Sequence, residues 1–560
     1  MVIREHTRNK LTSEESDLLM MYFGYTYKSD VGAIIYDKQV VQPQDTENLK
    51  FIPFNMKNNI IILPVGIVRL TLGDKYNKPL SSTTLPKTLT HLTFGYSYDQ
   101  YIDHDVLPRS LTHLTFGSSF NKKIKKNVIP PTLTHLVFGD RYNQKIGACV
   151  LPKNLVYLKF GYDFTQKIKK NVISNHDHME YLMLGYNYNH TLKPNVLPKN
   201  LIHLVIGGNY IKPIGKNVLP PHLKKLKFGM CYNNPITHKI FPNTLTHLEL
   251  PYFFNCTLEP NVLPSSLLYL VFGDGYNQPI QPFALPPNII TLQFGTTFNQ
   301  ILQKNSISPN IKTIIFGDRY NQSIDEFVLP IGLVNLTFYK DFNQRLAPGV
   351  LPQSLKILNF YGDFNCSFEP GALPNNIESL TLLKYDQPFG VGVLPNHLVN
   401  LYFGHQYNQK IHKYVLPNSL KRLEFGYCYN QKIGKHVLPP LLNTLVFGVE
   451  YDKKIGKDVL PKGLQILVFD GVSRLPFNDD IPQSLTYLGI GMYGDTCLQT
   501  LPHTVSVLDI PPDYDFVDIE HIKSNYNLVK TTNNKLMQHA NINRHNINTK
   551  RINLCEFMID

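Results

Sequence analysis

Apolar residues recur along this chain with a period of about 22 residues. A Leu-Pro pair opens most units, as at Leu63-Pro64, Leu85-Pro86, Leu107-Pro108 and so on to Leu501-Pro502. Self-similarity at a fixed period of this size is typical of a repeat architecture. Residues that belong to the repeat are therefore explained by the repeat before any catalytic role is considered.

One unit reads L-P-x-x-L-x-x-L-x-F-G-x-x-Y-N-Q-x-I-x-x-x-V, and we number its positions from the first leucine. Positions 8 and 10 point to the same side of an extended chain, which predicts a short strand whose positions 7 and 9 face outward. Glycine at position 11 is expected to end the strand by letting the chain turn. Proline at position 2 has no N–H, so that stretch cannot be a central strand.

The pattern predicts a mainly β fold, a right-handed solenoid of about 21 coils of 22 residues with a parallel sheet of short strands. Positions 1, 5, 8, 10, 14, 18 and 22 would fill the inside of each coil. One coil cannot cover its own apolar edge, so neighbouring coils must stabilise each other by stacking.

Two columns of side chains are expected to join the coils. Position 14 is aromatic from Tyr76 to Tyr451, which predicts a buried spine whose tyrosine hydroxyls need partners. Position 15 is mostly asparagine, as at Asn77, and this amide can bond backbone groups of its own coil and the next. Thr165 and Ile211 interrupt that column, so we expect looser coils there.

The run Tyr276-Asn277-Gln278-Pro279-Ile280 and its counterparts, such as Tyr76-Asn77-Lys78-Pro79-Leu80, resemble the FNIP repeat, a family related to leucine-rich repeats. The resemblance covers roughly residues 54 to 510. It implies repeats without an enzymatic site, and members are common in social amoebae and in giant viruses of amoebae. Some members carry an amino-terminal F-box, which implies a substrate-recognition adaptor of a ubiquitin ligase.

The two ends of the chain depart from the repeat. Within residues 1–62, Thr12-Ser13-Glu14-Glu15 is a capping box that predicts a small helical N-terminal cap. A degenerate F-box is the alternative for these residues, although the usual opening Leu-Pro-x-Glu is missing. We assign residues 63–510 to the solenoid and residues 511–560 to a C-terminal cap and mobile tail.

Composition restricts the compartment and the chemistry. The sequence contains no run of eighteen apolar residues, so it predicts no membrane span. Its charged start lacks the apolar segment of a secretory signal. The seven cysteines have neither C-x-x-C nor zinc spacing, which favours reduced thiols. We therefore expect an intracellular, cytoplasmic monomer (in the host cytoplasm if viral) that is not an enzyme and has no cofactor.

Outward positions 7 and 9 vary from unit to unit on a constant frame, which is how solenoids present a surface to a partner. The candidate partner-binding residues are His91, His113, His135, Tyr157, His203, Lys225, His247, Tyr269 and Arg422. Consecutive histidines could also bind a metal or sense pH. Because Cys, Asp and Glu are absent from those segments, solvent-facing histidines are the favoured interpretation, with no metal site.

Position 17 forms rows of like charge in a chain of net charge +13. The rows are Lys123, Lys145 and Lys167, and later Lys410, Lys432 and Lys454. They could attract an acidic protein or a polyanion, although a solvated lysine face is the simpler interpretation. Nucleic acid is disfavoured because we expect the aromatic residues to be committed to the inside, which leaves no rings for base stacking.

Three hypotheses for function follow. The first is a non-enzymatic scaffold that binds an unknown protein along the sheet, without membrane contact. The second is an adaptor that contacts ubiquitin-ligase components through residues 1–62. The third is polyanion or nucleic-acid binding through the lysine rows.

Overall fold

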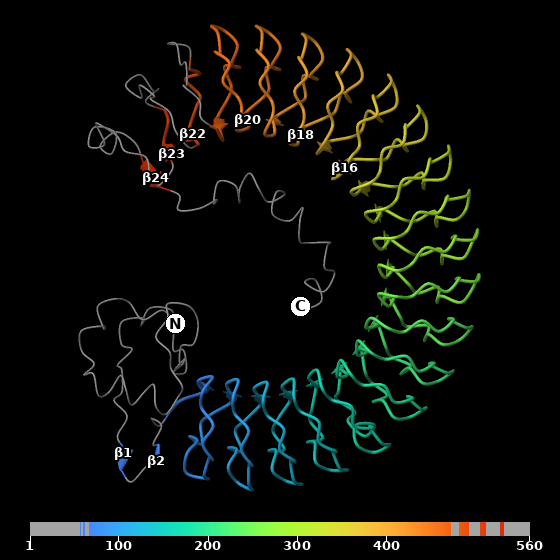
Figure 1. Cartoon of the computed structure of the whole chain (residues 1–560), viewed down its shortest axis with the longest axis vertical. Helices are drawn as coiled ribbons and strands as arrows, with labels where there is room; N and C mark the ends of the chain where they lie inside the picture. The colour runs from blue at the N-terminus through green and yellow to red at the C-terminus, as the bar shows by residue number, and fades with distance from the viewer. Residues whose placement is uncertain are drawn as a thin grey trace. The chain divides into compact units, whose positions relative to one another are not determined.

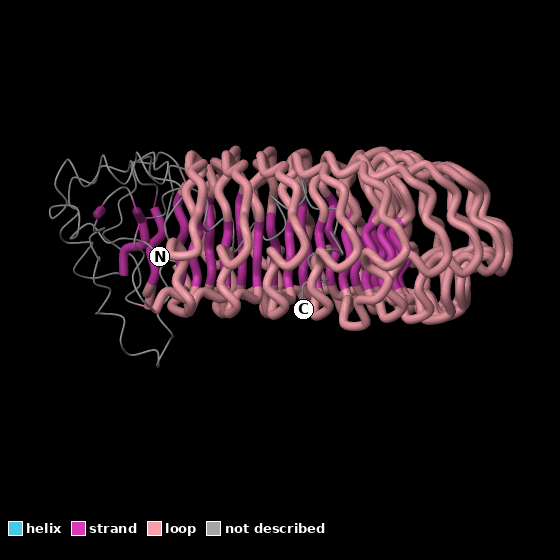
Figure 2. The backbone as a smooth tube through the Cα atoms, turned by 90° about the horizontal axis from the view of Figure 1, so that it is seen from below, coloured by secondary structure: helices cyan, strands magenta, loops and turns pink. Residues whose placement is uncertain are grey.

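The computed structural model describes residues 56–57, 60–61, 66–471, 481–491, 504–510 and 527–530. The chain divides into two compact units, Met1–Tyr276 and Asn277–Asp560. The predicted capping box, the F-box alternative and most of the predicted C-terminal cap and tail lie outside the described residues. Within those residues the chain forms strands and turns but no helix (Figure 2).

In the first unit, β1 (Met56–Lys57) and β2 (Ile60–Ile61) pair antiparallel. The remaining strands of this unit form a parallel sheet in chain order. They are β3 (Arg69–Thr71), β4 (His91–Thr93), β5 (His113–Thr115), β6 (His135–Val137), β7 (Tyr157–Lys159), β8 (Tyr181–Met183), β9 (His203–Val205), β10 (Lys225–Lys227), β11 (His247–Glu249) and β12 (Tyr269–Val271).

The second unit repeats this arrangement, again with each strand parallel to the next. Its strands are β13 (Thr291–Gln293), β14 (Thr313–Ile315), β15 (Asn335–Phe338), β16 (Ile357–Phe360), β17 (Ser379–Leu382), β18 (Asn400–Phe403), β19 (Arg422–Glu424), β20 (Thr444–Phe447), β21 (Ile466–Phe469), β22 (Tyr487–Ile490), β23 (Val507–Ile510) and β24 (Asn527–Lys530).

The register places equivalent positions of successive coils side by side. His91 pairs with His113, and His113 pairs with His135, so each position of the repeat becomes a column across the sheet. In each unit the strands lie on the inner side of the curve made by its coils (Figure 1). The predicted solenoid of short parallel strands is confirmed, and every strand of the parallel sheets has three or four residues.

The predicted inward positions form the core. In the coil that starts at Leu107, the side chains of Leu111, Leu114 and Phe120 are each at most 1% exposed. Phe120 stacks on Phe116 of its own coil at 4.0 Å between ring centroids. It also lies parallel to Tyr142 of the next coil at 5.9 Å. The aromatic position thus packs both within a coil and between coils, as predicted.

One detail of the core differs from the sequence-based expectation. The buried hydroxyls of Tyr98, Tyr320 and Tyr451 have no hydrogen-bond partner among the described residues, so the expectation of partners is wrong for them. Phenylalanine fills the same slot in other coils, so ring packing dominates at this position. Burial raises the pKa of the Tyr98 hydroxyl well above its usual range.

Glycine at position 11 is needed for close approach rather than for turning. A Cβ added to Gly117 would lie 1.8 Å from the carbonyl oxygen of Gly95 in the preceding coil. The left-handed backbone instead occurs at position 21, as at Asn127 and Gly349, with φ of 63° and 89°. The glycine column therefore sets how tightly successive coils stack.

Candidate partner-binding face

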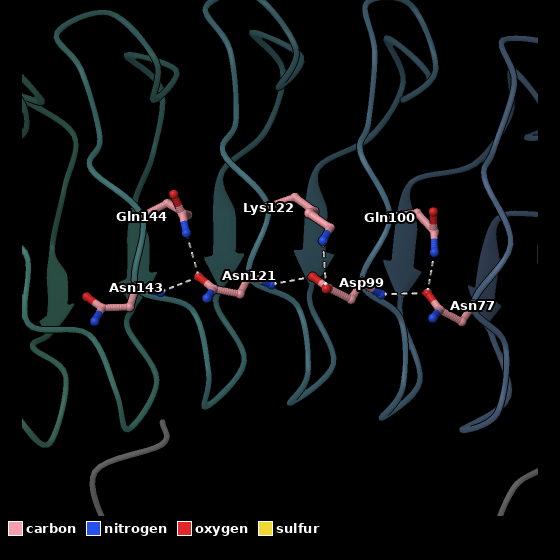
Figure 3. Close-up of polar contacts among 7 residues, drawn as sticks. All are labelled: Asn77, Asp99, Gln100, Asn121, Lys122, Asn143 and Gln144. Carbon is pink, nitrogen blue, oxygen red and sulfur yellow. Dashed lines mark hydrogen bonds and ion pairs between the residues drawn. The ribbon is translucent and has the colours of Figure 1, made fainter.

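An amide ladder at position 15 fixes the spacing of the coils that carry this face. In Figure 3 the backbone N–H of Asn143 donates to Oδ1 of Asn121 at 2.9 Å, and Gln144 Nε2 donates to the same oxygen at 3.0 Å. Asn121 N–H in turn donates to Oδ1 of Asp99 at 2.8 Å. The prediction that this side chain bonds the neighbouring coil is confirmed.

The same ladder runs through the second unit. Asn321 N–H donates to Asn299 Oδ1 at 2.9 Å, and Gln322 Nε2 donates to that oxygen at 3.0 Å. Asp386 replaces asparagine in one coil, and its carboxylate accepts from Asn408 N–H at 2.8 Å. An acceptor oxygen, rather than the amide group itself, is therefore what the position requires.

Residues other than asparagine at position 15, or glutamine at position 16, change the hydrogen bonds of the ladder. Cys366 replaces the usual glutamine, and its Sγ lies 3.3 Å from Oδ1 of Asn343, where the glutamine nitrogen would donate. Thr165 interrupts the asparagine column, and its hydroxyl donates to Asn143 Oδ1 at 3.1 Å. Ile211 has no polar side-chain atom to continue the ladder. That the coils beside Thr165 and Ile211 are looser remains a prediction.

The sheet face consists of the side chains at positions 7 and 9, and from β4 to β12 these are half-buried on either side of a buried leucine. In parts of the second unit, position 9 is buried, so the prediction that it faces solvent is wrong there. Thr337 is 9% exposed and is covered by Asn359, whose Nδ2 reaches its Oγ1 at 3.3 Å. Glu424 is 8% exposed and accepts from Arg422 Nε at 2.6 Å.

A column of rings covers part of the sheet face in the first unit. The imidazoles of His91 and His113 stack with centroids 4.1 Å apart and planes 10° apart. His113 and His135 repeat this at 4.1 Å and 11°. Tyr157 continues the column beside His135 at 5.7 Å, and Tyr181 stacks on Tyr157 at 4.3 Å. The structure thus brings together four of the predicted site residues.

The other predicted residues occupy the same face farther along. Lys225 pairs in the sheet with His203 on one side and His247 on the other. His247 stacks on Tyr269 at 4.3 Å. Arg422 is separate from all of these in sequence, because it lies in the second unit and is held by Glu424.

Each stacked histidine is fixed by the threonine before it. Thr90 Oγ1 lies 2.8 Å from Nδ1 of His91, and the same contact is 2.9 Å at His113. Burial lowers the pKa of the His113 imidazole to about 4, and repulsion from His135, His91 and Arg69 adds to this. The pKa values of His91 and His135 are also lowered, chiefly by burial. The column is therefore uncharged at neutral pH.

The described residues contain no group of three or more His, Cys, Asp or Glu side chains able to hold a metal ion. Face-to-face stacking also keeps the rings of His91, His113 and His135 nearly parallel, so their nitrogens do not converge on one point. The column can donate or accept hydrogen bonds along its edge, and it can take up protons.

The lysine rows occupy the exposed part of the coils. Lys123, Lys145, Lys167, Lys410, Lys432 and Lys454 are all exposed. None of the six makes an ion pair with another described residue, whereas the adjacent Lys122 pairs with Asp99 at 2.9 Å. The rows therefore present positive charge that nothing in the described structure neutralises.

Several aromatic residues are exposed, which the sequence did not lead us to expect. The prediction that the aromatic side chains are committed to the inside of the coils is therefore wrong for these residues. Phe283, Phe327 and Tyr414 are each more than 70% exposed. Tyr162 is 50% exposed and stacks on Tyr186 at 4.4 Å. A signal was present, because these rings lie at positions 12 and 21 rather than at the inward positions 10 and 14.

Comparison with known proteins identifies the architecture. Residues 54–97, 98–141, 142–176, 188–231, 232–275, 254–297, 298–341, 342–384, 385–428 and 429–471 match the FNIP Repeat. CroV588 of a giant virus, described as a novel circular LRR protein structure, is 40% identical with a TM-score of 0.74, over 81% of this chain and 70% of that chain.

A more distant structure shares the fold. A chain of the mouse RP105/MD-1 complex matches with 14% identity and a TM-score of 0.51, over 82% of this chain and 90% of that chain. YopM from Yersinia enterocolitica WA-314 matches with 22% identity and a TM-score of 0.47, over 77% and 88%. None of the curated protein sequences matches this chain. Among the described residues, no helix has the length and apolarity to cross a membrane.

Proposed function

The chain belongs to the FNIP repeat family, and from that premise we propose that it is a non-enzymatic scaffold that binds a partner protein along its sheet face. A leucine-rich-repeat-like solenoid is a fold typical of protein–protein interaction. The observation that carries the proposal is the contrast between the two kinds of position in each coil. Inward residues repeat with little change, whereas positions 7 and 9 differ from coil to coil.

The chemistry of these positions supports a protein partner. His247 and Tyr269 offer ring edges and hydroxyl or imidazole hydrogen bonds on a rigid sheet, and Lys225 adds a charge beside them. Aromatic side chains on a rigid frame supply contact area at small entropic cost, which is why they are enriched at binding interfaces. The amide and glycine columns behind the face hold it rigid, so little ordering is needed on binding.

Affinity purification with the full chain, followed by mass spectrometry, tests this proposal when it is paired with two variants. The face variant carries Tyr157→Thr and Tyr269→Thr, because Thr291 and Thr313 already occupy that position. The control variant replaces the exposed lysines at 123, 145 and 167 by glutamine. We expect the specific partner to be lost with the face variant and retained with the control. Retention with both variants contradicts the proposal.

A variant of the same purification without residues 1–62 addresses the adaptor hypothesis. Loss of ubiquitin-ligase components on that deletion alone would favour an adaptor, with the sheet face then selecting the substrate. Their absence from both samples would favour a scaffold that acts without a ligase.

The unpaired lysine rows support a second candidate, polyanion binding. Exposed like charges without ion pairs attract polyanions, and the affinity falls steeply as salt rises. Binding of a labelled single-stranded oligonucleotide at 50 mM and 300 mM salt tests this. Binding at 50 mM salt that weakens steeply at 300 mM and is lost in the lysine-to-glutamine variant favours it, and binding unaffected by the variant contradicts it.

A further inference from the structure

We infer that the histidine column on β4, β5 and β6 binds an acidic segment of a partner protein and takes up protons when it does so. The column is defined by His91, His113 and His135 in the first unit. This inference rests on the proposed function, because it names the chemistry of the partner at one part of the sheet face.

The stacking geometry determines which atoms remain for a ligand. With centroids 4.1 Å apart, each imidazole covers the face of the next, so the ring edges rather than the faces remain for a ligand. Nδ1 of each ring already contacts a threonine hydroxyl at 2.8 or 2.9 Å. The remaining polar atom is Nε2. A partner therefore meets three nitrogens in a row rather than three flat surfaces.

The charges around the column favour an anionic ligand. Positions 7 and 9 of strands β3 to β8 contain no carboxylate, whereas Arg69 lies on β3 at one end and Lys159 on β7 at the other. The turns after β3 and β6 carry Asp74 and Asp140, and both are engaged. Asp74 accepts from Tyr96 N–H at 3.1 Å, and Asp140 accepts from the Ser118 hydroxyl at 2.8 Å.

Proton uptake follows from the state of the free column. Burial and mutual repulsion keep the imidazoles neutral, because a charged ring would lie 4.1 Å from its neighbour with no carboxylate on the face to compensate it. A partner carboxylate at Nε2 supplies that compensation and favours the protonated ring. By linkage, a ligand that raises the pKa of a group binds more tightly as the pH falls.

The same geometry disfavours nucleic acid at this place. Single-stranded nucleic acid gains much of its binding energy from bases that stack on the faces of aromatic rings. In the column those faces are already covered by neighbouring rings. The row of ring edges suits carboxylates, which accept directed hydrogen bonds from imidazolium groups.

The test uses the full chain and two labelled probes, a ten-residue polyaspartate peptide and a single-stranded oligonucleotide of similar charge. Binding is followed by fluorescence anisotropy between pH 5.0 and 7.5 at low salt. Calorimetry in two buffers of different ionisation enthalpy counts the protons taken up. The column variant is His91→Gln, His113→Gln and His135→Gln, and the matched control replaces the exposed lysines at 123, 145 and 167 by glutamine.

We expect the affinity for the peptide to rise as pH falls, by up to about tenfold per pH unit for each proton taken up. The column variant should lose this dependence and the proton uptake, and the lysine control should keep both. A melting curve checks that each variant is folded, and the single change His113→Gln serves if the triple variant is not.

Three outcomes would overturn the inference. They are no peptide binding at low salt, binding without pH dependence, and equal binding by wild type and the folded column variant. An oligonucleotide that shows the same column-dependent, pH-dependent binding would also overturn it in favour of nucleic acid. The proposed function is tested separately, by capture of a native partner with the Tyr157 and Tyr269 variant. A negative result at the histidine column therefore leaves the outcome of that test open.

Discussion

Asn299 offers a test of the amide ladder, and another coil of the same chain supplies the matched control. Its Oδ1 accepts from Asn321 N–H at 2.9 Å and from Gln322 Nε2 at 3.0 Å. Asn299→Ala removes both bonds and leaves a half-buried backbone N–H without an acceptor. Each bond contributes about 1 kcal/mol net, and a partly buried unsatisfied donor adds to the loss, so we expect destabilisation of about 2 kcal/mol.

Asn299→Asp is the matched control, because Asp386 already does this work in another coil. Its carboxylate accepts from Asn408 N–H at 2.8 Å and from Gln409 Nε2 at 3.1 Å. Asn299→Asp should therefore stay within about 0.5 kcal/mol of wild type.

Urea unfolding gives the two free energies, and hydrogen exchange of the peptide that contains Asn321 locates the change. Exchange at that amide should speed up in Asn299→Ala and remain slow in Asn299→Asp. A cost of less than about 0.5 kcal/mol for alanine, or equal destabilisation of the two variants, would show that the ladder bonds do not stabilise the coils.

Three further changes probe packing and charge. Gly117→Ala places a Cβ 1.8 Å from the Gly95 carbonyl oxygen and should lower the unfolding free energy by about 3 kcal/mol or more. Gly147→Ala should be tolerated, because its Cβ would lie 3.6 Å from the nearest side-chain atom. Similar melting temperatures for the two variants would contradict this expectation. Tyr320→Phe removes a buried hydroxyl without a partner and should leave stability unchanged or raise it by about 1 kcal/mol in urea unfolding, so a clear loss would reveal a missed bond. The pKa of His113 is about 4 in the folded chain, against an ordinary value of 6.5, so the unfolded state binds more protons between these two pH values. Thermal stability should therefore fall as the pH drops from 7 to 5, and it should fall less steeply in His113→Gln. Parallel curves of stability against pH for the two proteins would count against a neutral ring.

The repeat made the fold and the residues of the sheet face predictable. In a solenoid of fixed period, residues one period apart become neighbours, so the column of Asn121 and Asn143 follows from the sequence alone. Outward residues such as His91 and Tyr157 followed from the alternation of side chains along a strand. The period therefore made it possible to predict tertiary contacts, which the sequence of a protein without repeats does not reveal.

Features that depend on distances between coils were not predictable in this way. Nothing in the pattern says that Gly117 touches the backbone of Gly95, because a glycine that turns the chain looks the same in sequence. Nor does the pattern reveal that Tyr98 buries its hydroxyl without a partner. Surface rings such as Phe283 were not predicted, because their position in the repeat carries other residues in most coils and so forms no recurring aromatic pattern.

Disulfide trapping across the sheet tests the stacking register most directly. Thr93 and Thr115 are paired Cα partners on β4 and β5, and Val137 is the next member of the column. Adjacent strands lie about 4.8 Å apart, within the span of a disulfide, whereas two coils span about twice that distance. We predict that Thr93→Cys with Thr115→Cys forms a cross-link, found by mass spectrometry of tryptic peptides, and that Thr93→Cys with Val137→Cys does not. Equal cross-linking of both pairs, or none in the first, would contradict the stacked coils on which the proposed binding face depends.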